Sequence, residues 1–153
     1  MEIESSIGLE SVRFPVLVIA DDGWVDYIDS PEQLSAWTYS AIRKYSKRRV
    51  MLYDSGENGW ILNKLEPSNP CSLLGKCLAS IANRQVPARL FVRSLSETPL
   101  EKAKELLYVA IDQDDDILTQ YNPANEIKDD VAKAYSFESL VEALKSKGAI
   151  LAD

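Results

Sequence analysis

The feature that most constrains the fold is a short hairpin signal followed directly by a capped helix start. Residues 14–20 form a continuous apolar and β-branched run, which is typical of a buried strand. The Asp-Gly pair at residues 22–23 is a turn signal, and residues 24–28 indicate a second strand. Ser30 and Gln33 match a capping box with Pro31 at the first helical position, so we expect a helix directly after the hairpin.

This first helix is expected to carry one apolar stripe at helical spacing. Its members are Leu34, Trp37, Ala41, Ile42 and Tyr45. We expect the core of the protein to include three residues of this stripe and two from later helices. These five residues are Leu34, Trp37, Ile42, Leu106 and Leu140.

A similar order of elements continues along the chain. Strands are indicated at residues 50–53, 60–65 and 89–93, and helices at residues 73–81, 98–111 and 136–147, with residues 112–125 as a loop. The order is therefore ββα-ββα-βα-α. Short hairpins favour a largely antiparallel, five-stranded sheet with helices over one face, which is an α+β fold. We expect one domain over residues 1–153, with residues 1–12 as a loosely ordered N-terminal segment.

The net charge of −7 lies entirely in the last third of the chain. Through residue 94, 11 acids balance 11 bases, whereas from residue 95 onward 13 acids stand against 6 bases. An acidic protein is a poor match for nucleic acids or anionic membranes, so we expect neither as a partner. No apolar run approaches the roughly 20 residues that span a bilayer, and the N-terminus does not resemble a signal peptide. These features favour a cytoplasmic protein.

The residue types present favour binding over catalysis. The chain has no histidine, so a Ser-His-Asp or Cys-His site cannot form within it. The glycines of residues 54–59 lie in a hairpin, without the following helix that a phosphate-binding loop requires. Cys71 and Cys77 match neither a CxxC redox pair nor a zinc-ligand spacing. We expect them to be free thiols, with a redox or disulfide role as the alternative. We therefore expect a non-enzymatic protein without a cofactor or metal.

An acidic cluster follows the third expected helix. It consists of Asp112, Asp114, Asp115 and Asp116, at a helix end where negative charge opposes the helix dipole. The EF-hand pattern fails because Ile117 and Pro123 stand where glycine and glutamate are required. A solvated loop, a protein-binding patch and a metal site are the alternatives. Acids at this helix end slightly destabilise the isolated fold. Partner binding would give them a role, so it is the hypothesis to test.

Two tryptophans and one basic segment are further candidates. Trp24 and Trp60 each follow a hairpin glycine at the start of a strand. They either plug the end of the sheet or form an exposed anchor, since tryptophan is frequent at interface hot spots. Residues 43–49 contain five cations, which either end a helix favourably or form a nucleic-acid patch.

Residues 23–34 and 53–62 of this small acidic chain resemble, at the level of class, the immunity proteins of bacterial toxin–immunity pairs. The resemblance implies a protein that acts without cofactors and binds a toxin domain tightly, often with acids facing a basic nuclease cleft. Complementary charge speeds such association and rejects wrong partners. We therefore expect an inhibitor of a cognate toxin domain, and a basic domain as its partner. The alternatives are a small-ligand-binding or regulatory domain, with a pocket between sheet and helices, and an adaptor subunit of a larger assembly.

Overall fold

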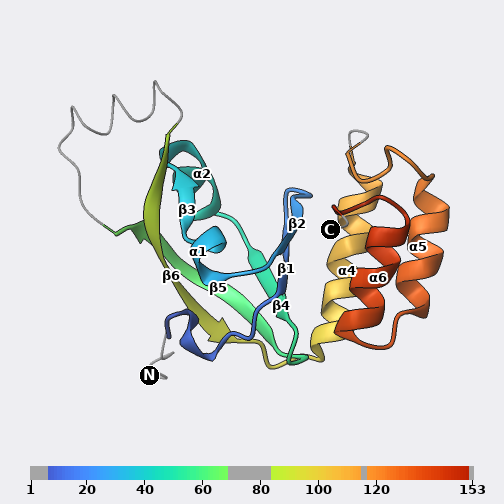
Figure 1. Cartoon of the computed structure of the whole chain (residues 1–153), viewed down its shortest axis with the longest axis horizontal. Helices are drawn as coiled ribbons and strands as arrows, with labels where there is room; N and C mark the ends of the chain where they lie inside the picture. Colours follow the sequence, from blue (N-terminus) through green and yellow to red (C-terminus); the bar gives the residue numbers. More distant parts are fainter. Residues whose placement is uncertain (1–6, 69–83, 115–116, 152–153) are drawn as a thin grey trace.

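The computed structural model describes residues 7–68, 84–114 and 117–151, and within them the chain has an α+β fold. Six antiparallel strands form a curled sheet in the order β2-β1-β4-β5-β6-β3 (Figure 1). The strands are β1 (Val16–Ala20), β2 (Val25–Ile28), β3 (Ala36–Thr38), β4 (Val50–Asp54), β5 (Gly59–Pro67) and β6 (Gln85–Ser94). The helical elements are η1 (Leu9–Ser11), α1 (Pro31–Leu34), α2 (Tyr39–Tyr45), α4 (Pro99–Asp112), α5 (Ala124–Lys133) and α6 (Phe137–Ser146).

The sheet carries helices on both faces, whereas the sequence predicted them on one. Helices α1 and α2 lie in its concave side, and α4, α5 and α6 form a separate layer beside β1 and β2 (Figure 1). Alternate residues of β1 and β4 face the two sides, so both strands are buried throughout. Leu17, Ile19, Met51 and Tyr53 join the helical layer, and Val16, Val18, Val50 and Leu52 join the concave core. This double burial explains the continuous apolar run at residues 14–20.

Both predicted hairpins are confirmed. Strand β1 pairs with β2 through a turn in which Gly23 has a φ of +94°, a conformation that favours glycine. Strand β4 pairs with β5 through a turn in which Glu57 has a φ of 66°. All five predicted strand segments lie within or overlap observed strands, and β5 and β6 are longer than expected.

The single helix expected over residues 30–45 is wrong, because the chain divides it into α1, β3 and α2. Ser30 caps α1 as predicted, its hydroxyl accepting from the backbone N–H of Gln33. The chain then extends and pairs with the early part of β6, with Trp37 opposite Val86. Thr38 caps the new helix α2 through the N–H of Ala41. The sheet therefore has six strands where five were predicted. The additional strand, β3, pairs with residues of β6 that precede the predicted start of that strand.

Three other expectations have different outcomes. Helix α5 was not predicted, because its polar sequence offers only Ile127 and Val131 as large buried residues. The helix predicted at residues 73–81 lies outside the described residues, and so do both cysteines, Cys71 and Cys77. Leu34, Trp37, Ile42 and Leu140 are buried as expected, but Leu106 is only partly buried and its neighbour Leu107 is fully buried instead.

The N-terminal segment is attached to the sheet from its first described residue. Ile7 and Val92 of β6 exchange two backbone hydrogen bonds, at 3.0 and 2.7 Å. Val12 is buried in the concave core. Residues 7–12 thus contact the sheet, residues 1–6 lie outside the described part, and the loose order expected of residues 1–12 stays a prediction.

Candidate functional site

The acidic cluster lies where α4 ends. Asp112 is the last residue of this helix, and its carboxylate forms an ion pair with Lys128 of α5. The last turn of α4 contains no basic residue, so Lys128 supplies the positive charge that this end of the helix dipole favours. The Asp112 side chain remains 60% exposed and is accessible to a partner. Asp115 and Asp116 lie outside the described residues.

The carboxylate of Asp114 is engaged by its own loop. Its Oδ2 accepts from the backbone N–H of Thr119 at 2.9 Å and from the Thr119 hydroxyl at 2.8 Å, and its Oδ1 accepts from the N–H of Ile117 at 3.3 Å. Burial raises the pKa of Asp114, but these hydrogen bonds and one from the Leu118 backbone outweigh it and lower the pKa. Asp114 therefore shapes the loop.

Two exposed apolar side chains lie in the connection between α4 and α5, which is at the top of the helical layer in Figure 1. Ile117 is 74% exposed and Tyr121 is 71% exposed. We name Asp112, Asp114, Ile117 and Tyr121 the loop end. Sequence reasoning missed its apolar members, although Ile117, Leu118 and Tyr121 interrupt an otherwise polar run. Large apolar side chains that are exposed close together are a feature of many protein-binding surfaces.

The loop end is fixed in position by the neighbouring helix. The side-chain amide of Asn122 donates to the carbonyl of Lys147, just after α6, at 2.8 Å. Lys147 in turn forms ion pairs with Glu126 at 4.0 Å and Asp130 at 3.6 Å, both on α5. These contacts tie the loop to α5 and α6. A loop held in this way loses less conformational entropy on binding than a flexible one.

Trp60 is not an exposed anchor. Its side chain is only 8% exposed, and its indole N–H donates to Oδ2 of the buried Asp54 at 2.8 Å. The ring packs in the concave core. The structure therefore favours the plug interpretation for Trp60, and this residue offers a partner little surface.

Trp24 lies in an aromatic cluster near the turn of the β1–β2 hairpin. The loop 54–58 lies at the opposite end of β1. Its ring centroid is 5.6 Å from that of Trp37 and 4.9 Å from that of Tyr45. The three rings line a cavity of about 350 Å³ between the sheet edge, α1 and α2. Trp24 is partly buried, so its ring contributes both to the core and to the wall of this cavity.

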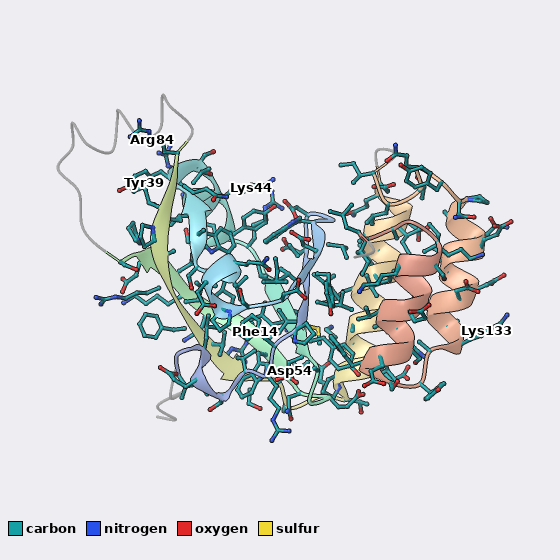
Figure 2. All side chains as sticks on the ribbon, viewed as in Figure 1. Phe14, Tyr39, Lys44, Asp54, Arg84 and Lys133 are labelled. Atoms are coloured by element: carbon teal, nitrogen blue, oxygen red, sulfur yellow. The ribbon has the colours of Figure 1, made fainter. Side chains whose placement is uncertain are left out.

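The basic segment ends α2 and is partly neutralised by the β1–β2 turn. Lys44 Nζ lies 2.8 Å from Asp22 Oδ2, and Arg48 lies 3.8 Å from Asp21. Figure 2 shows Lys44 between α2 and this hairpin. Asp22 also accepts a hydrogen bond from the Tyr45 hydroxyl at 3.0 Å. The cations at and just after the end of α2 therefore attach this helix to the sheet, in agreement with one of the two interpretations expected.

No family model, curated protein or solved structure gave a significant match to the chain. Among residues 7–68, 84–114 and 117–151, no group of three or more acidic, cysteine or histidine side chains is arranged to hold a metal ion. In the same ranges no helix is both long and apolar enough to cross a bilayer.

Proposed function

We propose that this chain is a non-enzymatic binding protein that inhibits a cognate toxin by docking a basic surface of it on the loop end. The observation that carries the proposal is the combination of exposed Ile117 and Tyr121 with Asp112 in one preorganised loop region. Aromatic and large apolar side chains supply most of the binding energy of an interface, and surrounding charges supply its selectivity.

The charge distribution supports a basic partner. The 13 acids and 6 bases beyond residue 94 give this part of the chain an excess of seven negative charges, whereas the preceding residues are balanced. An acidic surface attracts a basic one over roughly a Debye length, about 8–10 Å at physiological salt. The loop end therefore combines long-range attraction with apolar groups for close contact.

The test is affinity capture with two matched tyrosine variants. Tyr121 and Tyr135 are both exposed in the helical layer, but Tyr135 lies between α5 and α6 at the end opposite the loop end. We expect the wild type and Tyr135→Ala to retain the same basic protein from the native host, and Tyr121→Ala to lose most of it. Equal capture by all three forms would exclude the loop end as the docking surface.

The inhibitory part of the proposal needs a separate measurement. The captured protein is expressed alone, with the wild-type chain, and with Tyr121→Ala, and cell growth is followed. We expect the captured protein to arrest growth, the wild type to restore it, and Tyr121→Ala to restore it much less. A captured protein that is harmless when expressed alone would contradict toxin inhibition while leaving the docking surface intact.

A further inference from the structure

The curled sheet brings its two edge strands toward each other on the concave side (Figure 1). Trp24 stands directly before edge strand β2, and Trp37 lies in the opposite edge strand, β3. Their rings meet edge to face at a centroid distance of 5.6 Å and an interplanar angle of 81°. The sheet is thus a partly closed barrel whose open seam is bridged by aromatic side chains, and barrel mouths are common sites of ligand binding.

The cavity of about 350 Å³ lies in this seam and combines aromatic and polar groups. Trp24, Trp37 and Tyr45 supply the aromatic part of its lining, and Asp26, Gln33 and Gln85 supply polar side chains. Its volume falls in the lower part of the range for small-molecule sites, about 300–1,000 Å³. The cavity is therefore large enough for a small ligand or for one side chain of a partner.

Asp26 is the unusual member of this lining. Residues alternate along β2, so Asp26 points with Trp24 and Ile28 toward the concave side, opposite the fully buried Val18 of β1. Its Oδ1 accepts from the backbone N–H of Tyr27 at 2.9 Å. Within the described ranges no basic side chain forms an ion pair with it. Burial raises the pKa of Asp26, because the carboxylate has lost water without gaining a counter-charge.

A cationic side chain of the protein itself, Lys44, shows the arrangement that a ligand would need. On α2, Lys44 Nζ lies 5.2 Å from the Tyr45 ring centroid and 2.8 Å from Asp22. A carboxylate and an aromatic ring therefore share one ammonium group there. Asp26 and the two tryptophan rings offer the same pair of groups on the cavity side.

We propose that this cavity binds an organic cation, an alkylammonium or guanidinium group, with Asp26 as its counter-charge and Trp24, Trp37 and Tyr45 as its aromatic wall. A cation near an aromatic face gains about 0.5–2 kcal/mol, more as the site is desolvated. A partly buried carboxylate favours a cationic ligand over a neutral one, because a buried charge without a counter-charge costs free energy. This site shares no residue with the loop end and goes beyond the proposed function.

The test follows the three tryptophan indole N–H signals of the ¹⁵N-labelled protein by NMR. The probe is choline, and the control is its uncharged isostere 3,3-dimethylbutan-1-ol. Trp60 serves as an internal reference because it is buried and bonded to Asp54. We expect choline to shift the Trp24 and Trp37 signals and to leave Trp60 unchanged, with at least about tenfold weaker binding of the neutral isostere.

A matched pair of variants tests the counter-charge. Asp26→Asn keeps the shape of the side chain, and Asp29→Asn removes an exposed acid three residues away that does not line the cavity. We expect Asp26→Asn to abolish the preference for choline over its isostere, and Asp29→Asn to retain it. Binding of the neutral isostere as tight as measurable binding of choline, an unchanged preference in Asp26→Asn, or no shift of Trp24 and Trp37 with any cation tested would overturn the proposal.

A second pair of probes distinguishes a free cation from a side chain of a protein. These are blocked Gly-Arg-Gly and Gly-citrulline-Gly peptides, which differ in charge but hardly in shape. Binding of choline alone would identify a free alkylammonium ligand, and binding of the arginine peptide alone would identify a guanidinium side chain. Either result supports the site, provided that Asp26→Asn removes the preference for the charged probe.

Discussion

The indole N–H of Trp60 donates to the carboxylate of Asp54 across the β4–β5 hairpin, at 2.8 Å and out of contact with solvent. Asp54 also accepts from the backbone N–H groups of Arg13, Gly56 and Asn58, at 3.1, 2.9 and 3.0 Å. One fully buried carboxylate therefore joins the N-terminal segment, the hairpin turn and the start of β5.

Replacing Asp54 should be among the most damaging single substitutions. Asp54→Ala leaves four donors without their acceptor, and breaking a buried charged network typically costs about 3–5 kcal/mol. We expect a loss of that order in the free energy of unfolding, measured in urea. Asp29→Asn, at an exposed position, should change it by less than about 0.5 kcal/mol. A loss below about 1 kcal/mol for Asp54→Ala would contradict the role assigned to this carboxylate.

Trp37 should contribute strongly to the concave core. It is only 6% exposed, packs against Trp24 and Tyr45, and donates its indole N–H to the carbonyl of Leu34. Truncating a buried aromatic residue typically costs about 3–5 kcal/mol, so Trp37→Ala should fall in this range. Tyr135→Ala removes an aromatic ring that is 83% exposed and serves as the control. Similar urea midpoints for the two variants would show that the cluster is not part of the core.

Much of the sheet was predictable because its signals are local. Turn residues and capping groups act within a few positions, so both hairpins and the Ser30 cap could be located from neighbouring residues alone. Strand β3 could not, because residues 36–38 become extended only by pairing with β6 about fifty positions later. Helix α5 was missed for a related reason, since only contact with the rest of the layer buries Ile127 and Val131.

The candidate site was predictable only in part. Charge asymmetry is visible in the sequence and pointed to Asp112, whose exposed carboxylate lies at the loop end. The sequence does not reveal that the carboxylate of Asp114 accepts hydrogen bonds from Thr119 or that Trp60 is buried. The cavity beside Trp24 depends on the curl of the sheet, which brings together edge strands that are not neighbours in the chain.

Asp22 should stabilise the protein at neutral pH and lose that effect in acid. Burial raises its pKa, but hydrogen bonds from Lys44, the Trp24 backbone and Tyr45 outweigh it, so the folded-state pKa lies below the ordinary value of 3.8. The contribution is therefore complete above pH 3.8 and disappears as the pH falls through the lower folded-state pKa. Urea unfolding of the wild type and Asp22→Asn should show a difference at neutral pH that narrows in strong acid. A constant difference would contradict this linkage.

The ionised carboxylate of Asp26 should destabilise the protein at neutral pH, whereas that of Asp22 stabilises it. Its folded-state pKa is raised by burial, so its ionisation above the ordinary value of 3.8 opposes folding. Asp26→Asn keeps an acceptor for the Tyr27 N–H and removes the buried charge. We expect this variant to be more stable than the wild type at neutral pH and equally stable well below pH 3.8. Destabilisation at neutral pH would show that the charge is satisfied within the fold.

The most direct test of toxin docking is the association rate of the captured partner with the wild type and with Asp112→Asn, measured at low and high salt. Rim charges act mainly on the rate of association, and their effect is screened as salt is raised from about 50 to about 500 mM. We expect wild-type association to be the faster of the two at low salt and the two rates to converge at high salt. Identical rates that do not depend on salt would contradict docking of a basic surface on the loop end.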